Sequence, residues 1–284
     1  MIEPAAAYAY CREVACRAGT VLSFGFRQLP PPKRDAACAA IAFCRVALSP
    51  AAKQSPAAQQ DLIDWEAALE GCYQGTASHP ITVALADAAR RHDVPAQAYR
   101  DLIRGWRVEL ECRRYRTFEE LMDRYCTPVA HAAAAIAVQM LGSTSPAAPA
   151  LGRDLAAALL LTGILQEVHA DAGRGRICLP LLDLQQFGVR EQALVEGRPQ
   201  PGLSGLLQLQ IERARSYLRR AAALPQHLEA DARPCARCLA AACRMLLDRI
   251  EHAGPAILRR SVQLGPWAKL LLRQGRNGDR HRIS

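Results

Sequence analysis

Two carboxylates and two arginines close together in the chain carry the clearest potential chemistry. Glu167 and Asp171 lie four residues apart in a helix-like apolar stretch, and Arg174 and Arg176 follow them. Residues four apart share one face of an α-helix, so this pair could bind one divalent cation through its oxygens. The alternative is that the carboxylates pair with the two arginines and hold no metal.

The other reactive residue types form no comparable pattern. The histidines share no zinc-type spacing with carboxylates, no glycine-rich phosphate loop precedes a helix, and no serine or cysteine nucleophile has a visible partner. Eleven cysteines are scattered through helix-like segments, which favours buried thiols over a disulfide framework. Cys235 and Cys238 form the one tight pair, but a structural zinc would need two more ligands at similar spacing.

The elements that must position these residues are predicted to be helices. Half of the 284 residues are hydrophobic, only 5% are aromatic, and alanine and leucine predominate, which favours helices over strands. Apolar periodicity and end signals predict helices over 3–18, 33–48, 61–73, 80–91, 97–113, from a capping box at 117–120 onward, and over 151–170, 206–223 and 231–252. We therefore expect one all-α domain, residues 1–284, with roughly ten helices around a central space.

Charge and hydropathy restrict the partners. The net charge is +9, and a basic tail from about residue 265 suits an anionic membrane surface or nucleic acid. A solvated tail is the simpler interpretation, and no recognition motif for nucleic acid is present. Residues 267–273 are both basic and apolar, so they read as an interfacial segment or as a last core helix. No apolar run approaches the roughly 18 residues that span a bilayer and no secretory signal is visible. A cytoplasmic protein is expected, with peripheral contact to the inner face of the membrane as an option.

Two segments together resemble one enzyme family. Residues 25–34 followed by 42–45, and residues 158–180, are similar to signatures of the squalene/phytoene synthases, which join two prenyl diphosphates head to head. Weaker matches run in order almost end to end. The resemblance implies an isoprenoid-synthase-type bundle in which two helices face each other across a cavity, each with an aspartate-rich motif that binds Mg²⁺ on the substrate diphosphates. The chain looks most like the bacterial hopanoid branch that converts farnesyl diphosphate to presqualene diphosphate.

The chain departs from this family at the metal-binding positions. Leu48, Ser49 and Ala52 occupy the three aspartate positions of the first motif, and none of them can replace a carboxylate. Pro50 is also expected to end that helix. In the second motif only Asp171 is unchanged. Its other family residues, Gln, Asn, Arg, Asp and Glu, are replaced by Leu160, Gly163, Gln166, Glu167 and Ala170.

The basic residues of the family site are better preserved. Arg45, Arg174 and Arg176 match basic residues that the family places near the diphosphates, and guanidinium groups suit phosphate geometry. They could keep anion binding without catalysis, or they could be surface and loop-capping arginines.

Two hypotheses about function follow from the resemblance. The one we favour is a non-catalytic member that binds a prenyl diphosphate such as farnesyl diphosphate, or a prenyl lipid, and acts through an active paralogue. The other is an active, Mg²⁺-dependent prenyltransferase with an atypical metal site. It would need replacement carboxylates, for which Glu109, Glu111 and Asp64 are the candidates.

Overall fold

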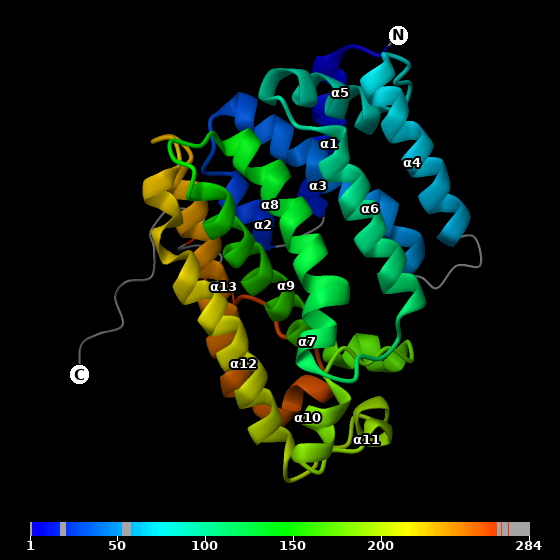
Figure 1. Ribbon diagram of the computed structural model, residues 1–284, viewed down its shortest axis with the longest axis vertical. Helices are drawn as coiled ribbons and strands as arrows, with labels where there is room; N and C mark the ends of the chain where they lie inside the picture. Colours follow the sequence, from blue (N-terminus) through cyan, green and yellow to red (C-terminus); the bar gives the residue numbers. More distant parts are fainter. Residues whose placement is uncertain (1, 18–20, 53–57, 266–267, 269–271, 273–284) are drawn as a thin grey trace.

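The computed structural model describes residues 2–17, 21–52, 58–265, 268 and 272, with the main chain alone for 48–52 (Figure 1). Within this part, the α-helices are α1 (Pro4–Arg17), α2 (Val21–Phe26), α3 (Pro31–Ala52), α4 (Ala58–Gln74), α5 (Pro80–His92), α6 (Ala96–Glu111), α7 (Phe118–Leu121), α8 (Thr127–Leu141), α9 (Ala148–Gly173), α10 (Leu181–Gln186), α11 (Glu191–Val195), α12 (Leu203–Arg220) and α13 (Arg233–Ala253). A π-helical segment, η1 (Met122–Cys126), joins α7 to α8, and two 3₁₀ segments, η2 (Ala221–His227) and η3 (Gly254–Leu258), follow α12 and α13.

The helices form one all-α domain, as expected. Figure 1 shows α8 and α9 through the middle of the molecule, with α12 and α13 on one side and α4 and α6 on the other. Helix α9 packs against α8 and α12, α6 packs against α8 and α4, and α1 packs against α3 and α5. One large apolar cluster of alanine, leucine, isoleucine and aromatic side chains connects most of these helices. The fold is therefore held mainly by burial of small and branched apolar side chains.

Helix α9 is more apolar than expected from the sequence. It has 26 residues and is long and apolar enough to cross a bilayer by length and composition, with a mean hydropathy of 1.4 over its best window. The expectation that no such stretch exists was therefore wrong. In the fold, α9 lies between α8 and α12 and contributes its apolar side chains to the core. A central helix enclosed by others can be apolar on most of its faces.

The structure differs from the predicted helices most clearly around α2 and at the end of α3; the short helices α10 and α11 were not predicted either. Helix α2 was not expected, because six residues carry too little periodicity. It forms because Phe24 is buried and Gly25 lies so close to α13 that an added Cβ would come within 2.6 Å of Leu239. Helix α3 continues through Pro50 to Ala52. Pro50 was expected to end this helix, but the described helix runs through it; a proline this far along a helix removes only one backbone donor.

Most of the predicted basic tail lies outside the described residues. Leu272 is described and is buried beside Phe24 and Cys238, and the side chain of Gln28 donates a hydrogen bond to its carbonyl at 3.0 Å. At Leu272, therefore, the predicted tail segment 267–273 packs against the core, which favours the core-helix interpretation over membrane-surface binding. Cys235 and Cys238 are themselves buried in α13, and all eleven cysteines are free thiols.

The start of α5 is fixed by an imidazole. His79 is its N-cap, and Nδ1 accepts a hydrogen bond from the backbone N–H of Ile81 at 3.2 Å. Thr82 completes a capping box by accepting from the His79 N–H. Only the neutral imidazole has the acceptor nitrogen that this cap requires. Burial also lowers the pKa of His79, because the charged ring is poorly solvated there.

We therefore predict that His79 contributes to loss of stability in acid. The pKa of His79 is lower in the folded protein than its unfolded value of about 6.5. The stabilisation by the neutral His79 cap is therefore complete above about pH 6.5 and is lost as the pH falls through the folded pKa. His79→Asn keeps a capping oxygen that does not titrate. Between about pH 7.5 and pH 5, urea unfolding should show a smaller drop in stability for this variant than for the native chain. The exposed His252→Asn is the control, and equal drops in all three proteins would contradict the prediction.

Candidate functional site

The C-terminal end of α9 turns back into the protein. The helix ends at Gly173, and Arg174 is its C-cap. Gly175 has a φ of 71°, a left-handed conformation that glycine adopts without strain. The chain then forms an isolated parallel bridge in which the N–H of Ile177 donates to the carbonyl of Arg113 at 3.0 Å. This reversal directs the side chain of Arg176 towards α6 and η1.

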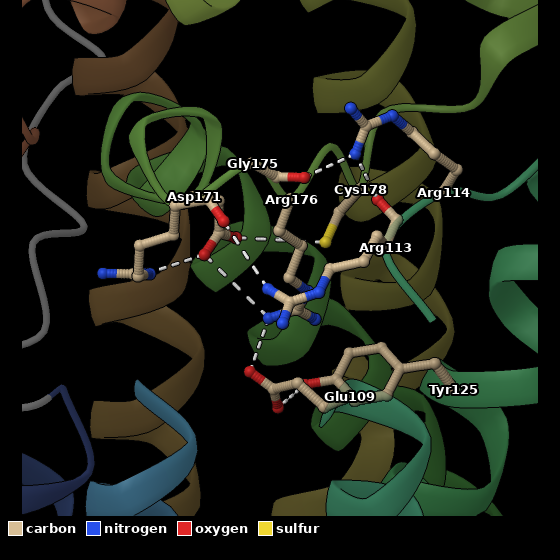
Figure 2. Close-up of polar contacts among 9 residues, drawn as sticks. Glu109, Arg113, Arg114, Tyr125, Asp171, Gly175, Arg176 and Cys178 are labelled. Carbon is tan, nitrogen blue, oxygen red and sulfur yellow. Dashed lines mark hydrogen bonds and ion pairs between the residues drawn. The ribbon is translucent and has the colours of Figure 1, made fainter. Parts of the chain in front are cut away.

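Arg176 is a buried cation shared by two carboxylates. Its side chain is 10% exposed, and Nη1 lies 2.5 Å from Oε1 of Glu109 and 3.9 Å from Oδ1 of Asp171. The guanidinium also lies over the ring of Tyr125, 5.3 Å from its centroid. Figure 2 shows these side chains converging from α6, η1 and the end of α9. Burial of one cation therefore ties three elements together.

Asp171 is engaged on several sides. Its Oδ1 accepts from Nη2 of Arg174 at 2.7 Å, and the thiol of Cys178 lies 3.9 Å from Oδ2. Its backbone carbonyl accepts from the N–H groups of both arginines, at 3.0 and 2.9 Å. The residue is 6% exposed. The carboxylate of Asp171 thus serves as the counter-ion of the two arginines.

The charge states of the neighbouring groups follow from their surroundings. Burial lowers the pKa of Arg176, but the negative charge of Glu109 and further neighbours raises it overall, so the guanidinium stays charged. Burial and then Glu109 raise the pKa of Tyr125 well above its usual value, and its hydroxyl donates to Oε2 of Glu109 at 2.8 Å. Burial raises the pKa of Cys178 to about 12 although Arg176 opposes this. Cys178 therefore remains a thiol at neutral pH and is no nucleophile.

Two further arginines, Arg113 and Arg114, hold the reversed loop from the segment that follows α6. Arg114 donates from Nη1 to the carbonyl of Gly175 at 2.6 Å, and its Nε lies 2.5 Å from Glu191. Arg113 reaches the carbonyl of Arg174 at 3.5 Å. These contacts anchor the loop that carries Arg174 and Arg176 to the segment after α6.

The structure brings together some of the predicted site residues. Asp171, Arg174 and Arg176 form one cluster. Glu167 is exposed on α9, and Arg45 is exposed on α3; among the described residues no hydrogen bond or ion pair joins either of them to the cluster. The positions of Leu48, Ser49 and Ala52 are helical, and their side chains lie outside the description.

The role of Glu109 was not foreseen. From the sequence it was weighed only as a replacement metal ligand, whereas it pairs with Arg176 and Tyr125. The other two candidates lie elsewhere: Glu111 is exposed at the end of α6, and Asp64 is exposed on α4, where it accepts from Gln60 at 2.9 Å. Glu109 and Arg176 are 67 residues apart, so no local pattern links them.

The described residues at this cluster do not fit bound Mg²⁺. Mg²⁺ takes near-octahedral oxygen coordination and usually needs carboxylates that are not neutralised by other cations. Asp171 faces two arginines, and in the described part of the chain no three His, Cys, Asp or Glu side chains lie close enough to hold a metal. The cavity beside Asp171 and Arg176 has a volume of only about 10 Å³. A cavity of that size holds at most one water.

Comparison of the sequence with known proteins gives one family. The family model for squalene/phytoene synthases matches residues 16–268. The 15-cis-phytoene synthase of Synechococcus elongatus is 33% identical over 280 residues, covering 93% of this chain and 90% of the relative. The phytoene synthase of Arthrospira platensis is 30% identical over 279 residues, with the same shares of each chain covered. These relatives are phytoene synthases, so the hopanoid branch expected from the sequence is not confirmed.

Solved structures give the same fold. A dehydrosqualene synthase crystallised with a ligand superposes with a TM-score of 0.87 at 23% identity, covering 95% of both chains. The squalene synthase HpnC from Alicyclobacillus acidocaldarius has a TM-score of 0.71, also at 23% identity, covering 98% of this chain and 97% of its own. The resemblance seen in residues 25–34 and 158–180 is thereby confirmed over nearly the whole chain, and the protein belongs to the squalene/phytoene synthase family.

Proposed function

We propose that this member of the family binds a prenyl diphosphate without condensing two of them, and that it serves isoprenoid biosynthesis through an active paralogue. The observation that carries the proposal is the position of Asp171. It is the one second-motif aspartate left unchanged, and its carboxylate is paired with Arg174 at 2.7 Å and faces Arg176 at 3.9 Å. A carboxylate neutralised by two arginines is a poor ligand for a cation.

The chemistry of condensation explains why this matters. Ionising an allylic diphosphate releases a highly charged leaving group, which must be neutralised as the bond breaks. On α3, the three positions that match the first aspartate motif are Leu48, Ser49 and Ala52. Loss of these ligands, together with the engagement of Asp171, leaves Glu167 as the one second-motif carboxylate that is not paired with these arginines.

Binding of a diphosphate requires fewer groups than its ionisation does. Arginine binds phosphate oxygens directly, through paired N–H groups, and requires no metal to do so. Arg174 is suited to this contact because its side chain is 36% exposed while Asp171 orients it. Arg45 is exposed on α3 and offers a second cation. Arg176, at 10% exposure, acts as a positioning residue that holds Asp171 and the loop.

The first prediction concerns turnover. With Mg²⁺ and radiolabelled farnesyl diphosphate or the longer geranylgeranyl diphosphate, the pure protein should form no presqualene diphosphate, squalene or phytoene. Leu48→Asp/Ser49→Asp/Ala52→Asp is run beside it, to test whether the first motif alone limits the reaction. An active phytoene synthase is the positive control. Condensed product from the native chain would show an active prenyltransferase with an atypical metal site and would refute the proposal.

The second prediction concerns binding. Calorimetry with farnesyl diphosphate should give similar affinity in EDTA and in Mg²⁺. Arg174→Ala should weaken binding about tenfold, because a charged hydrogen bond contributes on the order of 1.5 kcal/mol. Arg259→Ala, an exposed arginine on another element, should change little. Binding that requires Mg²⁺, or equal losses in both variants, would count against an arginine-based site.

A further inference from the structure

A cavity between α1, α2 and α3 is lined by three arginines. These helices form the blue part of the chain in Figure 1, and both α1 and α2 pack against α3. The cavity has a volume of about 180 Å³ and is lined by Arg12 of α1, Arg27 directly after α2 and Arg34 of α3. Arg34 and Arg45 are 11 residues apart on α3, about 16.5 Å at 1.5 Å per residue. This α1–α3 cavity therefore lies apart from the contacts proposed for the prenyl diphosphate.

The positive charge of the α1–α3 cavity is only partly balanced. Nη1 of Arg12 pairs with Oδ1 of Asp35 at 2.7 Å. In the described part of the chain, the guanidinium groups of Arg27 and Arg34 make no hydrogen bond or ion pair, and Nε of Arg34 is buried without an acceptor. Buried donors in native proteins are nearly always paired. Two arginines beside one cavity therefore keep unused donors and an uncompensated charge.

The cations converge on one thiol of the cavity wall. Cys38 lines the cavity with the arginines. Burial raises the pKa of Cys38 to about 11, and the neighbouring Cys16 and Asp35 add to this rise. The positive charges of Arg34 and Arg12 act in the opposite direction on the same group. Side chains from α1 and α3 thus place positive charge at the same point of the cavity.

The remaining walls and the size of the cavity restrict its occupant. Ala15 and Ile41 are 3% and 6% exposed and, with Phe26, give the cavity apolar walls. Charged hydrogen bonds are stronger beside such walls, because water screens them less. A volume of about 180 Å³ is below the roughly 300–1,000 Å³ of clefts that hold drug-sized ligands. The cavity therefore suits a small ion better than a prenyl chain.

We propose that the α1–α3 cavity binds a small phosphate anion, such as orthophosphate or inorganic diphosphate, through Arg27 and Arg34. The planar fork of a guanidinium matches the spacing of phosphate oxygens. A dianion would balance the two unpaired charges, whereas a neutral or cationic occupant would leave both uncompensated. The site does not rest on the function proposed above, because neither Arg174 nor Arg45 takes part in it.

The test is calorimetry with sodium diphosphate in EDTA, on a protein that carries Arg174→Ala to remove the other proposed anion contact. This protein should bind diphosphate saturably at one site. Adding Arg27→Ala/Arg34→Ala should weaken binding about tenfold or more, because charge-assisted hydrogen bonds are lost. Adding Arg237→Ala/Arg259→Ala instead removes the same charge from exposed positions on other elements and should leave affinity within about twofold.

Cys16 provides a local readout of the same event. It is exposed and lines the α1–α3 cavity. Bound diphosphate should slow its alkylation by N-ethylmaleimide, followed by peptide mass spectrometry. In the protein with Arg27→Ala/Arg34→Ala, diphosphate should leave the rate unchanged. A purely structural role of these arginines would not make the alkylation rate depend on the ligand.

Three results would overturn the proposal: no saturable binding in the Arg174→Ala protein, equal losses in the control variant, or unchanged Cys16 alkylation at saturating diphosphate. If the double substitution at Arg27 and Arg34 prevents folding, Arg27→Ala alone replaces it, since this side chain is exposed. The single variant should still weaken binding and reduce the protection of Cys16.

Discussion

A guanidinium buried in a helical core can stay charged there only if carboxylates face it. Arg176 meets this condition through Glu109 on α6 and Asp171 on α9, while its plane lies over Tyr125. Leaving such a cation without partners costs several kcal/mol. The position of Arg176 therefore fixes how the loop after α9 packs against α6 and η1, and everything around the candidate site depends on it.

The same constraint limits what Asp171 can do. A carboxylate between two arginines is already compensated, and a divalent cation would have to displace them or share it against their repulsion. In this chain the opposite helix offers no carboxylates at the first-motif positions either, since Leu48, Ser49 and Ala52 stand there. In the function proposed above, these two departures act in the same direction, because each removes a ligand for a divalent cation, while Arg174 stays partly exposed for contact with an anion.

Local signals predicted most of the fold and only part of the site. Apolar periodicity, the capping box at Thr117 and the proline breaks placed the long helices within a few residues. Helix α2 depends on tertiary contact of Gly25 with Leu239, which no local pattern reveals. At the site, Asp171 and Arg174 are three residues apart in the sequence, so their pairing could be predicted from it. The pairing of Glu109 with Arg176 joins residues 67 apart, and only the packing of α6 against η1 and the α9 loop creates it.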